Sequence, residues 1–188
     1  MSKTAASYPQ IGRAQTLRLV KMSSMVAISI VLVYLIHFPI FPAVAFLEYD
    51  PADISILIGT FAFGPAAGVL LTLVTSVIQG VTVSAGSGLY GIIMHLLATG
   101  TLVVISGSVY HIRKTRTSAV IGLVLGMMGM AVVMLGANLI ITPLFMGVSR
   151  EMVWDLMPFI VGFNLIKAGI NGAVTFLLYK RISGFLKK

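Results

Sequence analysis

The sequence predicts an all-α membrane protein, a single compact bundle of six transmembrane helices with both termini in the cytoplasm. The first reason is composition: the 188-residue chain is 58% hydrophobic and only 10% charged, a balance that ordinary soluble domains do not have. The second is that the apolar residues gather in long runs, several of which reach the ~20 residues that a helix needs to cross a bilayer. A chain of this length has room for one such domain and no second one.

Six apolar segments are expected to form the helices. A polar, basic tail at residues 1–16 comes first and lacks the cleavage site of a secretory signal. The single membrane domain is then expected to cover residues 17–183, followed by a basic tail at 184–188. Gly64-Pro65 separates the second segment, which is short for a full crossing, from the third, and we expect a tight turn there. The predicted spans are residues 17–37, 54–63, 66–82, 92–110, 118–146 and 159–180.

The segment between the first two spans is expected to lie at the membrane surface. Its three prolines exclude a regular helix, and its apolar residues favour contact with the membrane. Asp53, directly before the second span, is expected to be that helix's N-cap. Asp50 and Asp155 are expected to be solvated charges, whereas Glu48 is a candidate lid contact because apolar residues flank it.

The distribution of charge predicts the topology. Six spans place both termini on one side of the membrane, together with every lysine and arginine except Arg150 and Lys167. All five acidic residues fall on the opposite side. The positive-inside rule therefore places both termini in the cytoplasm. The same partition accounts for the net charge of +8, so that charge gives no reason to expect nucleic-acid binding.

A lysine in the middle of the last apolar segment is the strongest functional signal. Lys167 lies roughly 14 Å below the outer helix end, too deep to reach the interface easily. A charge at this depth is costly and needs partners. We expect ligand oxygens and Asn164 to offset that cost, with Glu48 as the best candidate acid. Asn164, Asn171 and Thr175 share the face of Lys167; this stripe either faces a solute site or bonds neighbouring helices.

The other large polar side chains of the spans lie in their outer halves. Gln79, His95 and Asn138 all fall there, whereas the inner halves offer only serine and threonine. A channel would need polar groups through the full depth, so the pattern predicts a cup that opens to the outside. For His95 a packed, hydrogen-bonded role and a ligand contact both remain open. The three histidines lie at different depths, which argues against a metal site.

Motifs of catalysis are missing from the sequence, so we expect no enzyme, no catalytic residue and no cofactor. The chain has no cysteine, no phosphate-binding loop and no nucleophile elbow. It also has no acidic residue within the predicted spans, as a proton-coupled carrier would normally need. The chain is thus expected to bind a solute but not to energise its transport. An intramembrane enzyme and a structural assembly protein are the alternatives.

The size, the long first loop and residues 53–68, DISILIGTFAFGPAAG, together resemble the substrate-binding S component of an energy-coupling factor (ECF) vitamin transporter. The resemblance covers about residues 17–180. The stretch LEYDPAD at 47–53, with Asn164-x-x-Lys167, is most similar to the riboflavin-specific member. The resemblance implies vitamin uptake from outside across the bacterial plasma membrane. It also implies docking, through small residues of the first span, onto a transmembrane coupling subunit driven by two ABC-type ATPases.

The docking positions would be Ser23 and Ala27, a small-xxx-small pair that allows close helix approach. The family pattern often has alanine where this chain has Ser23. For riboflavin, asparagine amides can form hydrogen bonds with the polar edge of the ring, because they both donate and accept. Methionine and aliphatic side chains can cover the ring faces. The candidate binding residues are Leu47, Glu48, Tyr49, Gln79, Met94, Asn138, Asn164 and Lys167.

Overall fold

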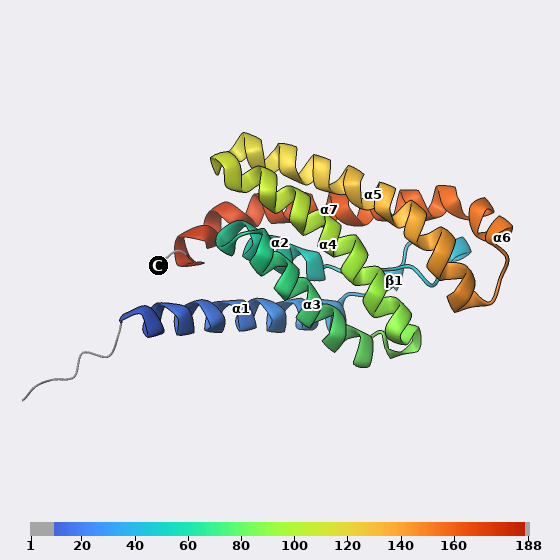
Figure 1. The fold of residues 1–188 in the computed structure, drawn as a ribbon, viewed down its shortest axis with the longest axis horizontal. Helices are drawn as coiled ribbons and strands as arrows, with labels where there is room; N and C mark the ends of the chain where they lie inside the picture. The colour runs from blue at the N-terminus through green and yellow to red at the C-terminus, as the bar shows by residue number, and fades with distance from the viewer. Residues whose placement is uncertain (1–9, 187–188) are drawn as a thin grey trace, which may run out of the picture.

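The computed structural model describes residues 10–186, and over this range it confirms the all-α prediction apart from one two-stranded hairpin (Figure 1). Residues 1–9 and 187–188, the outer parts of the two predicted tails, lie outside the described residues. The helices are α1 (Gln10–Leu35), α2 (Ala52–Phe63), α3 (Pro65–Val81), α4 (Gly88–Arg113), α5 (Arg116–Met146), α6 (Arg150–Asp155) and α7 (Met157–Leu186). The remaining elements are β1 (Phe38–Pro39), β2 (Glu48–Tyr49) and the 3-10 turns η1 (Pro42–Val44) and η2 (Ala85–Ser87).

Four of the described helical segments are long and apolar enough to cross a membrane: Gly12–Leu35, Ala85–Arg113, Arg116–Met146 and Met157–Tyr179. The helices α2 and α3 have 12 and 17 residues. At 1.5 Å per residue they extend about 18 Å and 26 Å, less than the ~30 Å of a hydrocarbon core. Six full crossings therefore remain a prediction. The short helix α6 and the hairpin were not predicted.

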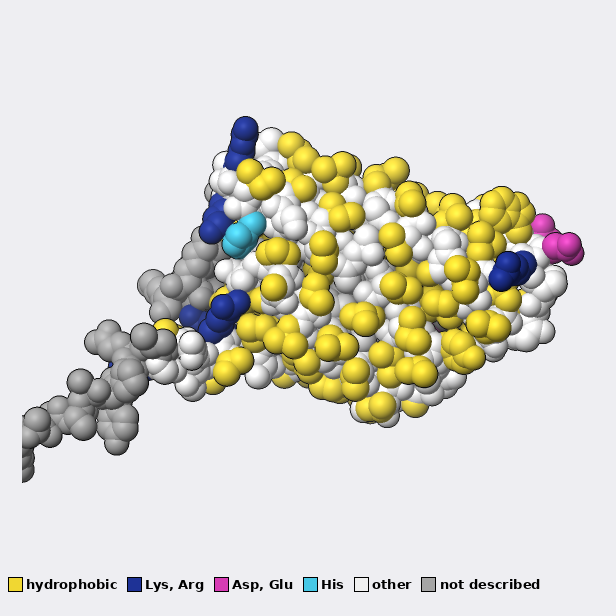
Figure 2. Space-filling model, in the orientation of Figure 1, with side chains coloured by type: hydrophobic (Ala, Val, Ile, Leu, Met, Phe, Trp, Pro, Cys, Tyr) yellow, Lys and Arg dark blue, Asp and Glu magenta, His cyan; other side chains and the backbone are white. Residues whose placement is uncertain are grey.

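The two ends of the bundle differ in charge. Figure 1 shows the start of α1, the α4–α5 connection and the end of α7 at one end, and α6 with the hairpin at the other. In Figure 2 lysine and arginine side chains gather at the first end, acidic side chains appear at the second, and the surface between them is mostly hydrophobic. This arrangement matches the charge partition read from the sequence. Which end faces the cytoplasm stays a prediction.

The turn between α2 and α3 is the tight turn that the sequence predicted. Gly64 has a φ of 98°, a conformation that glycine adopts without the steric cost of a side chain. Pro65 then occupies the first turn of α3, where a missing N–H breaks no helical hydrogen bond. The two short helices can therefore reverse direction within a single residue.

Glycines bring α4 and α5 into close contact. A Cβ atom added at Gly122 would lie 2.8 Å from the carbonyl oxygen of Ser106, and one at Gly126 would lie 2.9 Å from that of Leu102. The two glycines are four residues apart, the spacing that lets helix backbones approach closely in membranes. This contact fixes α4, which carries His95 and Thr99, against the rest of the bundle.

Helix α1 lies at the edge of the bundle and packs against α2 and α3. The Ser29 hydroxyl donates to the carbonyl of Ala52 at 3.1 Å, and the Ser55 hydroxyl donates to that of Met25 at 2.8 Å. These contacts use one face of α1 only. The other face, which carries Ser23 and Ala27, is exposed.

The loop before α2 does not stay at the surface as predicted. After β2 it enters the bundle, so that Asp50 is only 3% exposed and Asp53 is fully buried. The expectation of a solvated Asp50 is therefore wrong, whereas Asp155 is exposed as predicted. The expectation that Asp53 is an N-cap is also wrong, because α2 already begins at Ala52 and Asp53 lies in its first turn.

Candidate ligand-binding site

A cavity lies between the first loop and helices α3, α4, α5 and α7. It contains about 740 Å³ of empty space, the solvent at its open mouth included. Its lining combines apolar side chains with polar and charged ones, which can bind a small molecule and fix its orientation. Of the predicted binding residues, those that line it are Leu47, Glu48, Gln79, Met94, Asn164 and Lys167.

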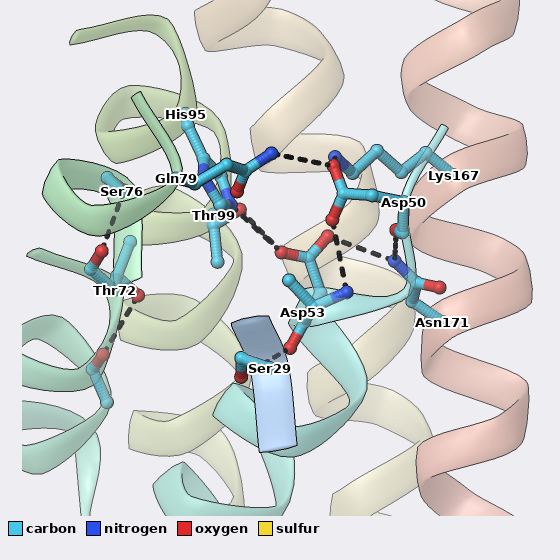
Figure 3. A network of polar contacts seen from close by, with 12 residues as sticks. Ser29, Asp50, Asp53, Thr72, Ser76, Gln79, His95, Thr99, Lys167 and Asn171 are labelled. Atoms are coloured by element: carbon cyan, nitrogen blue, oxygen red, sulfur yellow. Dashed lines mark hydrogen bonds and ion pairs between the residues drawn. The ribbon is translucent and has the colours of Figure 1, made fainter. Parts of the chain in front are cut away.

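The buried partner of Lys167 is Asp50. The Lys167 Nζ lies 2.7 Å from Asp50 Oδ2, and the two side chains are 9% and 5% exposed. Glu48, the acid expected from the sequence, instead pairs with His37 at 2.9 Å, where both side chains are partly exposed. The ion pair joins α7 to the first loop (Figure 3), and both of its residues line the cavity.

A second buried carboxylate, Asp53, lies beside this pair (Figure 3). Its Oδ1 accepts a hydrogen bond from the Thr99 hydroxyl at 2.7 Å and lies 3.4 Å from His95 Nε2. Its Oδ2 accepts from the Asn171 amide at 3.1 Å. A buried carboxylate needs several such donors because burial removes its hydration. The start of α2 is thereby tied to both α4 and α7.

Asn171 links the first loop to α7. Its amide nitrogen also donates to the backbone carbonyl of Asp50 at 3.0 Å, and its side-chain oxygen accepts from the Tyr49 hydroxyl at 2.9 Å. Burial, reinforced by the neighbouring Asp50 carboxylate, raises the pKa of the Tyr49 phenol, so this hydroxyl keeps its proton at neutral pH. Tyr49 therefore holds the loop in place, and it does not line the cavity.

The two asparagines expected to read a ligand lie in different surroundings. Asn164 lines the cavity, and its amide donates to the carbonyl of Ile160 at 2.8 Å. Asn138 is fully buried, donates to the carbonyl of Met134 at 2.8 Å and accepts from the Thr142 hydroxyl at 2.8 Å. It is not among the cavity-lining residues. For both residues, contact with a ligand stays a prediction.

Two polar side chains of the cavity each have a buried atom that lacks a hydrogen-bond partner among the described residues. These atoms are Gln79 Oε1 and His95 Nδ1. The packed, hydrogen-bonded role expected for His95 is confirmed, since its Nε2 lies against Asp53. The residue also lines the cavity, and contact with a ligand stays a prediction. Buried polar atoms without partners are rare in folded proteins, and the residues of these two atoms line the cavity, where water or a ligand can satisfy them.

Several cavity residues were not foreseen from the sequence. Asp50 was assigned to the surface, although the run Asp50-Pro-Ala-Asp53 places two acids close together in a chain with one deeply placed lysine. The deeply placed lysine needs an acidic partner, and this need was the signal that could have identified Asp50 as buried. The apolar lining residues gave no signal, because the sequence does not distinguish an apolar residue that faces a cavity from one that faces lipid or another helix. The apolar lining residues that were not among the candidate binding residues are Phe46, Ala98, Met130, Met134 and Phe163.

Fold and cavity together define a helical membrane protein with a cavity between its helices and first loop. The chain belongs to the family of ECF transporter substrate-specific components, whose model matches residues 17–179. This match confirms the resemblance read from the sequence. It also places the chain among membrane transporter components rather than enzymes.

The relatives agree in length and fold. The chain is 28% identical over 186 residues to the riboflavin transporter RibU of Staphylococcus aureus (strain TCH60), which covers 95% of this chain and 97% of that protein. It also resembles a solved structure of the S component of a bacterial ECF transporter, with a TM-score of 0.79 and 29% identity over 93% of this chain and 99% of that one.

Proposed function

We propose that this chain binds riboflavin in the cavity, at the outer side of the bacterial plasma membrane, for uptake driven by a separate ATP-hydrolysing module. The observation that carries the proposal is the buried ion pair of Lys167 and Asp50, two residues that line the cavity. Ionisable groups at such depth mark solute sites by default. The similarity to RibU, a riboflavin transporter, supports riboflavin as the ligand.

Riboflavin fits the chemistry of the walls. Its flat ring system offers two apolar faces, and Leu47, Met94 and Phe163 supply apolar surface from three different parts of the cavity. An ammonium has three donors, and the bond from Lys167 to Asp50 uses one of them. The remaining donors can reach ring carbonyls or ring nitrogens. Asn164 adds an amide oxygen on the same helix.

The proposed topology has six spans, both termini in the cytoplasm and the cavity mouth outside. The energising partners are a transmembrane coupling subunit and two ABC-type ATPases, because the chain contains no nucleotide-binding motif of its own. Docking through the exposed face of α1 is supported by a groove between α1 and α3, lined by Ser23, Val26, Leu70 and Val74 among others. A helix of the coupling subunit could approach there beside Ser23 and Ala27.

The test is a ligand titration of the purified protein in mild detergent. Flavin fluorescence should be quenched saturably, and the protein should release a yellow flavin on denaturation if it is purified from cells. Thiamine and pantothenate are the controls and should leave flavin binding unchanged. Competition by either of them would favour an S component for another vitamin. Saturable binding of none of the three would favour a membrane assembly protein.

A further inference from the structure

The cavity has two unlike polar walls. On α7, Lys167 already has a charged partner and Asn164 bonds its own helix. On α3 and α4, Gln79 Oε1 and His95 Nδ1 are buried and have no partner among the described residues. Gln79 is 9% exposed and the His95 side chain 10%, so bulk water is largely excluded from both. Both atoms line the cavity, where a bound ligand can donate to them.

The carboxylates fix which atoms point into the cavity. Gln79 Nε2 lies 3.5 Å from Asp50 Oδ2 and 3.4 Å from the Ser84 hydroxyl. Because a carboxylate only accepts hydrogen bonds, the amide nitrogen must face it and the amide oxygen must face the cavity. In the same way His95 Nε2 carries the proton that faces Asp53. In the tautomer with its proton on Nε2, Nδ1 is an acceptor.

We infer that the Gln79–His95 wall binds the hydroxylated side chain of riboflavin, and that the Lys167–Asn164 wall binds its ring. This inference rests on the proposed function. The polar edge of the isoalloxazine ring has a single N–H among its carbonyls and unprotonated nitrogens, so it cannot donate to two acceptors at once. The sugar-alcohol chain carries several hydroxyls, and each one can donate. A hydroxyl also accepts, so it can pair with His95 Nδ1 whether or not the imidazole carries a second proton.

The opposite wall has the complementary chemistry. Lys167 offers only donors, which match the carbonyls and unprotonated nitrogens of the ring. The buried Phe163 lies one helical turn before it and also lines the cavity, where it can cover a ring face. The two walls are joined through Asp50, since both Lys167 and Gln79 place a nitrogen against its Oδ2. The ring and the sugar-alcohol chain of the ligand are thus bound by side chains of different helices.

The test compares riboflavin with lumiflavin, which has the same ring and a methyl group in place of the chain. Gln79→Met removes the acceptor of one residue. His95→Leu removes the acceptor of the other, while Asp53 keeps its hydrogen bonds from Thr99 and Asn171. Either change should weaken riboflavin binding by at least about fivefold, the scale of one hydrogen bond, and should leave lumiflavin affinity unchanged. Ser76→Ala is the matched control, because Ser76 lines the cavity but donates to the Thr72 carbonyl at 2.7 Å.

Lumiflavin binding also shows that each variant is folded. An equal loss for both flavins would place the ring, and not the chain, against Gln79 and His95, and would overturn the inference. Unchanged affinity for both flavins would overturn it as well. A wild-type protein that binds neither flavin would refute the proposed function itself, which is a different outcome from either of these.

Discussion

The buried ion pair makes a quantitative prediction about stability. Replacing Lys167 by methionine keeps a side chain of similar length and removes the charge. The Asp50 carboxylate, 5% exposed, would then keep the backbone N–H of Ala52 at 3.1 Å and the distant Gln79 amide at 3.5 Å. Removing one partner of a buried pair costs about 3–5 kcal/mol, because it leaves an uncompensated charge. We expect Lys167→Met to lower the free energy of unfolding by this amount in the absence of ligand.

A second substitution separates this cause from lost packing. Asp50→Asn keeps the shape of the side chain and removes its charge. In the Asp50→Asn background, Lys167→Met should cost less than it does alone, by at least about 2 kcal/mol. The measurement is equilibrium unfolding in mixed micelles, followed by circular dichroism, for the two single variants and the double variant. Arg150→Met, which removes an exposed cation, is the control and should change stability by less than about 0.5 kcal/mol.

Additive costs in the double variant would refute the reasoning. They would mean that Lys167 and Asp50 do not interact in the folded protein, whatever each contributes alone. A Lys167→Met variant as stable as the wild type would have the same consequence. Either result would mean that the partner of Lys167 is another residue or the ligand.

The remaining predictions concern topology, docking and packing. Because the chain has no native cysteine, Glu151→Cys should react with an impermeant maleimide in whole cells and Arg116→Cys should not; the reverse pattern would invert the proposed topology. Ala27→Leu should preserve riboflavin affinity and reduce ATP-driven uptake, since added bulk blocks close helix approach; full uptake would exclude this face as the docking surface. Asn171→Leu should lower the unfolding free energy by about 1–3 kcal/mol, because it removes donors from the buried loop, and an unchanged thermal midpoint would contradict this. Gly122→Ala should cost about 1–3 kcal/mol, because the new Cβ would lie 2.8 Å from a carbonyl oxygen of α4; wild-type stability would show that the helices separate freely.

The sequence predicted what depends on local chemistry. The long apolar segments are helices, one predicted end coincides with that of α5 at Met146, and Gly64-Pro65 forms the expected turn. Local sequence patterns could not predict that Asp50 is buried, because its partner Lys167 is 117 residues away along the chain. The prediction that Asp53 is an N-cap was wrong for a similar reason. Its position before an apolar run is typical of a cap, and only contacts from α4 and α7 reveal its burial.

The candidate site was predictable where a large polar residue interrupts an apolar segment. Gln79, Asn164 and Lys167 stand out in this way, and all three line the cavity. Asn138 stands out equally but does not line it. Helix α5 is apolar on nearly every side, so periodicity cannot fix its rotation about its own axis. The direction of that asparagine is set by packing, which the sequence does not display.

The peripheral position of α1 has a consequence for how such a protein can diversify. None of the described cavity-lining residues belongs to α1, and Ser23 and Ala27 on the outward face of α1 are exposed. Substitutions at well-separated sites act almost independently on free energy. Substitutions in the cavity can therefore change which solute it binds while the outward face of α1 stays the same. An engineer could exchange ligand preference by changing α3, α4 and α7 alone, and evolution has the same freedom.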